Sequence, residues 1–263
     1  MRYVFGLLGA AVLGSLAFAG AAVAADRSHD TDLRETLEPG TTLEVRGILG
    51  SIVAAPGPGN VAIIHAHAVS SDADPADVAV RATRIGDRLV VCTIYPDSGR
   101  TDCGEHSGRR VQHGDYEGNV RVDFTVTVPS GVKFRAQAVD GDVVASRLSG
   151  DVSASVVHGD VRIDTSGQAD VRTVDGAIEA TIGATTNEGD LNFETVNGSI
   201  RLTLPHDANA AISARTLSGP IDGAGLSVDD GQWVGHTATA RLGHGGPHIL
   251  LRSVSGSIHV SQS

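Results

Sequence analysis

The sequence predicts an all-β protein, a parallel β-helix or solenoid of short strands with glycine turns. Three observations support this. A five-residue unit recurs from residue 139 onward: apolar, small polar, glycine, any residue, apolar. After each glycine, apolar and polar residues alternate with a period of two, and no segment has a convincing helical period. The 263 residues include 33 glycines but only 3% aromatic residues, which suits a narrow interior filled by Val, Ile, Leu and Ala.

Residues 1–25 predict a signal peptide. Arg2 precedes an apolar stretch that ends in small residues, which gives a cleavage site at Ala24 and Ala25, just before Asp26. A retained membrane anchor is the alternative, because about 20 apolar residues can span a bilayer, but the small-residue end favours cleavage. We therefore expect an exported protein, in the periplasm, at the cell surface or outside the cell, with no integral membrane span after cleavage.

The segment before the repeats predicts a flexible tail followed by irregular strands. Residues 26–40 are polar, and we expect a single solenoid domain over residues 41–263. Alternation predicts N-terminal strands at residues 41–48, 61–69, 78–84, 88–95 and 119–128. An open solenoid end is an unpaired sheet edge and needs a cover. The expected caps are these strands and residues 223–248, which interrupt the glycine period and include Trp233.

Cys92 and Cys103 flank a turn and predict a disulfide. In an exported protein an isolated close pair of cysteines most simply oxidises, here closing a 12-residue loop. Two alternatives are open: free thiols, or a zinc site that adds His106 and His113, although C-x10-C is not a usual zinc spacing. The polar, glycine-rich residues 104–118 predict an exposed loop.

The repeated unit is expected to form the corners of stacked coils. Its glycine supplies a backbone conformation that other residues resist, the residue before it favours turns, and the flanking aliphatic residues favour strands and face a core. The turn glycines are Gly141, Gly150, Gly159, Gly176, Gly198, Gly219 and Gly256. Asn-Gly and Asp-Gly also suit antiparallel hairpins. Units that recur every nine residues, and later every 17 to 22, instead favour coils stacked about 4.8 Å apart.

The ordered repeats resemble a known family. The units are VDGDV, LSGDV, HGDV, VDGAI and VNGSI, and the segments RLVVCTIYP and VRVDFTVTVPSGVKFRAQAVDGDV lead into them. Over residues 41–263 they are similar to the bacterial "putative adhesin" family. The resemblance implies an exported, right-handed parallel β-helix of undefined function, and it supplies no catalytic motif.

The sequence offers no residue set that points to a catalytic or metal centre. The Gly-Asp units lack the double glycine of calcium β-rolls, and G-x-S-x-G is absent. His65 and His67 share a strand face but lack a third ligand at an informative spacing, as do His236, His244 and His248. Nine aromatic residues and no interpretable acidic pair weaken a sugar-cleaving site. The net charge of −11 argues against nucleic acid as a partner.

The sequence therefore favours a non-catalytic, adhesin-like envelope protein. Its repeat surface would bind or scaffold an envelope component, a surface component or another protein. We predict no enzyme activity, cofactor or metal. One alternative is a polysaccharide-degrading β-helix enzyme. The other is a metal or small-ligand module that uses residues 104–118 or 223–248. The ligand and the oligomeric state are not predicted.

Overall fold

The computed structural model describes residues 27–104, 119–183, 189–223, 225–229 and 235–263. The predicted cleavage site at Ala24 and Ala25, and nearly all of the loop at residues 104–118, lie outside these residues. Within them the chain is all-β apart from two 3-10 helices, η1 (Pro75–Asp77) and η2 (Pro96–Ser98). Neither of these helices has the length or the apolar character of a membrane span.

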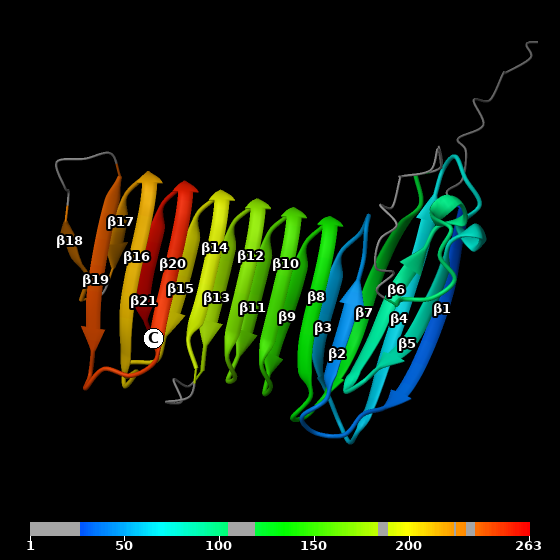
Figure 1. Ribbon diagram of the computed structural model, residues 1–263, viewed down its shortest axis with the longest axis horizontal. Helices are drawn as coiled ribbons and strands as arrows, with labels where there is room; N and C mark the ends of the chain where they lie inside the picture. The colour runs from blue at the N-terminus through cyan, green and yellow to red at the C-terminus, as the bar shows by residue number, and fades with distance from the viewer. Residues whose placement is uncertain (1–26, 105–118, 184–188, 224, 230–234) are drawn as a thin grey trace, which may run out of the picture.

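The described strands form two sheets, of ten and eleven strands, that run side by side along the molecule (Figure 1). The ten-stranded sheet has the order β1 (Arg27–Thr36), β4 (Val61–Ser70), β7 (Arg121–Pro129), β3 (Ile52–Gly57), β9 (Val143–Leu148), β11 (Val161–Thr165), β13 (Ile178–Ile182), β15 (Ile200–Leu204), β21 (Ile258–Gln262), β17 (Ile221–Gly223). The eleven-stranded sheet has the order β18 (Ser227–Asp229), β19 (His236–Leu242), β16 (Ala210–Ser218), β20 (His248–Ser255), β14 (Leu191–Asn197), β12 (Ala169–Asp175), β10 (Val152–His158), β8 (Lys133–Asp140), β2 (Thr42–Arg46), β6 (Arg88–Ile94), β5 (Ala79–Ile85).

The middle of the molecule is a β-solenoid in which each coil gives one strand to each sheet. The coils β8–β9, β10–β11, β12–β13 and β14–β15 stack in parallel. Every second side chain of a strand points inward, so that Val152, Ala154 and Val156 of β10 are all buried. The predicted all-β solenoid is therefore confirmed, and its core is built mainly from aliphatic side chains.

Most of the turn glycines stack at one corner of the solenoid. From one coil to the next they are Gly50, Gly141, Gly159, Gly176, Gly198, Gly256 and Gly219. A Cβ on any but the first would lie less than 3.0 Å from the carbonyl oxygen of the preceding glycine in this stack. Their N–H groups also bond across coils, as from Gly176 to the carbonyl of Asn197 at 3.0 Å. Gly150 differs, because it stacks with Gly167 at the opposite corner. Successive glycines that are nine residues apart therefore lie at alternate corners of the solenoid.

At each end of the solenoid a terminal coil is inserted between two others. Strand β2 lies between β8 and β6, and β3 lies between β9 and β7. Strand β20 lies between β14 and β16, and β21 lies between β15 and β17. The stacking order of the coils therefore differs from their order in the chain. Strands β19 and β18 extend the eleven-stranded sheet as antiparallel strands, which places a cap within residues 223–248; Trp233 lies outside the described residues.

The prediction of a flexible tail over residues 26–40 is wrong for β1. This strand pairs antiparallel with β4 along its whole length, from Arg27 opposite Ser70 to Thr36 opposite Val61. Its side chains are exposed or half-buried, so no apolar alternation marks it in the sequence. Backbone pairing with β4 orders the strand, and the fully buried Leu37 anchors the chain directly after it.

Candidate functional site

A groove lies on the outer face of the eleven-stranded sheet and runs along the solenoid axis. It runs over β10, β12, β14, β20 and β16 to the start of β19, and its volume is about 920 Å³. The first five of these strands are parallel and in register, so residues at equivalent positions lie side by side in rows. The chemistry of the groove is therefore the chemistry of these rows.

The first row is aliphatic and exposed. We call its members the aliphatic ladder: Val157, Val174, Val196, Val254 and Leu217. Each is the first apolar residue of a repeated unit, and their side chains are between 37% and 52% exposed. Scattered exposed aliphatic residues are normal on a protein surface, but a contiguous apolar patch usually marks an interaction site.

The exposure of the ladder corrects one prediction. Both aliphatic residues of each unit were expected to face the core, but a strand turns alternate side chains outward. Because Val156 points inward, its neighbour Val157 points to solvent. The second aliphatic residue of the unit does face the core, as Val161 and Ile178 show with at most 1% exposure. In the unit LSGDV, which lies at the opposite corner, Leu148 is also buried.

A second row of the groove is charged. It consists of Arg172, Glu194, Arg252 and Arg215, which occupy paired positions on four neighbouring strands. Glu194 lies between two partners, 3.5 Å from Nε of Arg172 and 3.2 Å from Nη1 of Arg252. Exposed ion pairs of this kind add less than about 1 kcal/mol each to stability. With three arginines and one glutamate, this row gives the groove a positive edge.

A third row carries buried hydroxyl groups that the fold itself uses. Its members are Thr173, Thr195, Ser253 and Thr216. The hydroxyl of Thr195 donates to the carbonyl of Gly176 at 3.0 Å, and that of Ser253 donates to the carbonyl of Gly198 at 3.0 Å. These hydroxyls therefore satisfy the carbonyl groups of the glycine corner. Thr216 lies opposite His236 of β19, but its hydroxyl donates to the backbone carbonyls of Ser218 and Gly256.

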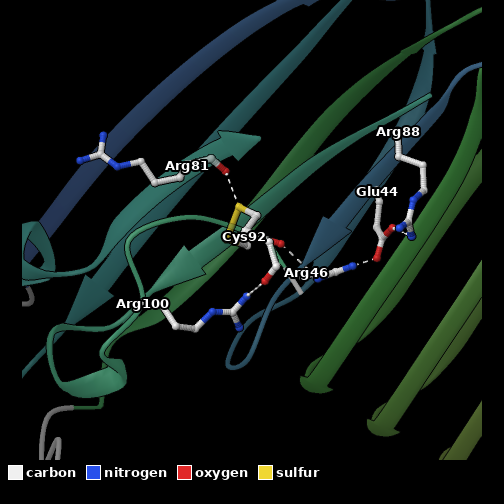
Figure 2. A network of polar contacts seen from close by, with 8 residues as sticks. Glu44, Arg46, Arg81, Arg88, Cys92 and Arg100 are labelled. Carbon is white, nitrogen blue, oxygen red and sulfur yellow. Dashed lines mark hydrogen bonds and ion pairs between the residues drawn. A yellow bond between two sulfur atoms is a disulfide. The ribbon is translucent and has the colours of Figure 1, made fainter. Parts of the chain in front are cut away.

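The structure confirms the disulfide between Cys92 and Cys103 (Figure 2). The two Cα atoms are 5.7 Å apart, within the usual range for the bond. Both cysteines are buried in a small second apolar cluster with Val90 and Ile94, which holds the segment after η2 against the outer face of β6. With both sulfur atoms in this bond, the free-thiol and zinc alternatives do not apply to Cys92 and Cys103.

A buried carboxylate lies close to the disulfide (Figure 2). The side chain of Glu44 on β2 is fully buried and contacts Nε of Arg46 at 2.6 Å and Nη1 of Arg88 at 3.1 Å. Nη1 of Arg46 also donates to the carbonyl of Cys103 at 3.4 Å. Both carboxylate oxygens are engaged by guanidinium groups, so Glu44 joins β2, β6 and the disulfide loop structurally. Sequence reasoning missed this residue, because a charged residue between two core aliphatic residues usually faces solvent, as Arg162 does between Val161 and Ile163.

We predict that the double substitution Cys92→Ala/Cys103→Ala lowers the free energy of unfolding by about 3 kcal/mol, since the bond closes a short loop in the unfolded chain. Urea unfolding followed by circular dichroism measures this. Fully reduced wild-type protein serves as the control and should unfold at the same midpoint as the variant. Equal midpoints for the variant and the oxidised wild type would show that the bond contributes nothing to stability.

The structure gives His65 and His67 a third neighbour of ligand type. The register of β1 and β4 places Asp30 opposite His67 and Asp32 opposite His65. Oδ1 of Asp30 lies 2.5 Å from Nδ1 of His67 and 3.8 Å from Nε2 of His65. The hydrogen bond from His67 holds the pKa of Asp30 below its ordinary value. Within the described part of the chain, no comparable group includes His236, His244 or His248.

Comparison with known proteins places this fold. The family model described as Toastrack DUF4097 matches residues 51–261. A solved structure described as a "putative cell adhesion protein" from Clostridium sporogenes ATCC 15579 is 11% identical, with a TM-score of 0.47 over 89% of this chain and 100% of the other. A "putative adhesin" from Bacteroides fragilis NCTC 9343 is also 11% identical, with a TM-score of 0.30 over 89% and 97%. No curated protein matches the chain.

The family match extends from the start of β3 to the last strand and includes every glycine of the repeated units. It confirms the resemblance found in the ordered repeats. The chain belongs to the Toastrack DUF4097 family.

Proposed function

We propose that this protein is a non-catalytic, exported envelope protein that binds a protein partner along its groove. The aliphatic ladder is the observation that carries the proposal. Its five side chains lie at one register position on five neighbouring strands, and each is at least 37% exposed. Keeping a row of aliphatic residues in water costs free energy that a partner would recover by covering it.

The rows beside the ladder indicate what kind of partner would fit. Apolar contact along the ladder suits a protein surface with aliphatic side chains. The excess of arginine in the charged row suits acidic groups beside them, because complementary charge steers association and sets orientation. The described residues that line the groove include one carboxylate, Glu194, and no Phe, Tyr or Trp side chain. Glycoside cleavage uses a pair of carboxylates, so this lining supports binding better than sugar chemistry.

Two further features support export and an envelope location. Residues 1–25 have the pattern of a signal peptide. The disulfide between Cys92 and Cys103 suits an oxidising compartment outside the cytoplasm. Together they support a location in which an envelope or surface protein could reach the groove.

A photo-crosslinking amino acid at Val196, in the middle of the ladder, tests the proposal in the producing cells. The control position is Val53 on β3 in the other sheet, which is 41% exposed against 40% for Val196. We expect a crosslinked adduct at Val196 and none at Val53. The adduct should be degraded by protease, because the proposed partner is a protein. No adduct at Val196, equal adducts at both positions, an adduct resistant to protease, or an adduct with a second copy of this chain would contradict the proposal.

We predict that Val196→Asp weakens binding of the crosslinked partner by roughly tenfold or more, because it places a charge in the apolar contact. The fold should remain stable, since exposed substitutions usually change stability by less than about 0.5 kcal/mol. Pull-down with purified variant, quantified for that partner, measures the change. Val53→Asp is the matched control and should bind as the wild type does. Equal loss in both variants would show that the ladder is not the contact.

A further inference from the structure

The outer face of the β1–β4 strand pair carries a compact group of histidine and aspartate side chains. Alternation along β4 places His65 and His67 on one face, and alternation along β1 does the same for Asp30 and Asp32. This pair of strands lies at the opposite end of the molecule from β19 and the groove (Figure 1). Any role of this group is therefore separate from the proposed role of the ladder.

We propose that Asp30, His65 and His67 form a binding site for a divalent transition metal ion, and that this ion is Zn²⁺. Each of the three residues offers one ligand atom, and these atoms all lie within 4.8 Å of one another. Oδ1 of Asp30 is the atom nearest both imidazoles, close to Nδ1 of His67 and to Nε2 of His65. Two imidazoles and a carboxylate are a ligand set that zinc accepts, with a fourth position left to water.

The distances suit such a site after small side-chain rotations. Ligands at about 2.0–2.1 Å from a tetrahedral ion are about 3.4 Å apart. Oδ1 of Asp30 lies 2.5 Å from one imidazole nitrogen and 3.8 Å from the other, on either side of that value. Zinc would replace the proton that His67 and Asp30 share. Because all three ligands stand on paired strands, their backbones are already fixed in relative position.

Asp32 supplies a second, independent indication. Its Oδ1 lies 2.8 Å from Nδ1 of His65, on the side of the ring opposite the proposed ion. This contact holds the Nδ1–H tautomer and leaves the lone pair of Nε2 free to face the metal. A carboxylate–histidine–metal arrangement of this kind is typical of zinc ligands. Asp32 is therefore a positioning residue of the site.

The strand on the other side of β4 carries a further carboxylate. Asp123 of β7 lies opposite His67, and Arg121 compensates its charge at 2.9 Å. A bound ion would link β1, which is almost entirely polar, to the edge of the solenoid.

Isothermal titration with ZnCl₂ of protein purified without an affinity tag and stripped of metal tests the site. We expect saturable uptake that disappears in His65→Ala/His67→Ala, and tetrahedral Co²⁺ absorption bands in the wild type only. Asp32→Ala should weaken binding about tenfold, and Asp32→Asn, which keeps an acceptor for Nδ1–H, should recover part of this loss. His259→Ala, in a surface pair with Asp222 that has no second imidazole, is the control and should bind as the wild type does.

Hydrogen exchange gives a second measurement of zinc binding, which does not depend on the heat of binding that calorimetry records. Zinc should slow exchange of the β1 amides in the wild type and leave them unchanged in the double variant. Circular dichroism of each variant confirms that the solenoid is intact. Absence of zinc uptake by the wild type, or equal uptake by the wild type and the double variant, would overturn the assignment. Neither result would bear on the proposed role of the ladder.

Discussion

Replacing Gly198 by alanine is expected to lower the free energy of unfolding by about 3 kcal/mol, because the added methyl group overpacks the contact between two coils. An added Cβ would lie less than 3.0 Å from the carbonyl oxygen and carbon of Gly176. These are backbone atoms of the neighbouring coil, so no side chain can rotate away to make room. One of the two coils must move.

Such a movement is costly because the glycine corner also carries hydrogen bonds between coils. The N–H of Gly198 donates to the carbonyl of Ser255 at 2.9 Å, and the N–H of Gly176 donates to that of Asn197 at 3.0 Å. Separating the coils lengthens these bonds and loosens the core beneath the corner, where Ile200 is 1% exposed.

Gly183→Ala is the matched control for this prediction. A Cβ at Gly183 would lie 3.6 Å from Ser166, which is ordinary van der Waals contact. Its stability should change by less than about 0.5 kcal/mol. Urea unfolding of both variants measures the difference. If Gly198→Ala and Gly183→Ala unfold at the same midpoint, steric exclusion at the stacked corner is not what requires glycine there.

The sequence was most informative where packing leaves few choices. Each coil can pass the glycine corner only if its residue there has no side chain, so the corner is visible as a repeated Gly. The outward position of Val157 could also have been read, because Val156 and Val157 are adjacent and only one of them can face the core. Assigning both aliphatic residues of the unit to the core ignored this alternation.

The features that could not be read depend on long-range pairing. Strand β1 is polar because it covers only the edge of the sheet. Nothing in its own residues distinguishes it from a flexible tail. The proposed metal site was missed for the same reason. His65 and His67 were recognised as sharing a strand face, but Asp30 reaches them only through the pairing of β1 with β4.

The order of the coils is a further feature that the repeats conceal. All units present glycine and similar aliphatic residues to their neighbours, so the repeats alone do not show which coils are adjacent. The insertion of β20–β21 between β14–β15 and β16–β17 therefore has no local signature. It does have a consequence for stability, because the last residues of the chain occupy an interior position.

Ending the chain at residue 247 is expected to abolish cooperative folding of the C-terminal part of the solenoid. The missing residues include Ile249, Leu251, Ile258 and Val260, each at most 1% exposed. Burial of four such side chains contributes on the order of 8 kcal/mol, comparable with the whole stability of many domains. The truncation also leaves two unpaired edges that face each other, β14 on one side and β16 on the other.

A chain that ends at Leu204 provides the control, because it lacks β16 to β21 altogether and leaves a single open end at β14–β15. Although it is shorter, it should be more soluble and more resistant to protease than the chain that ends at residue 247, since unpaired edges promote aggregation. Thermal unfolding, size-exclusion chromatography and limited proteolysis compare the two. A cooperative transition in the longer chain, close to that of the full protein, would mean that β16–β17 can stack directly on β14–β15. In that case either β20–β21 or β16–β17 could stack on β14–β15, and the interior position of the inserted coil would not determine stability.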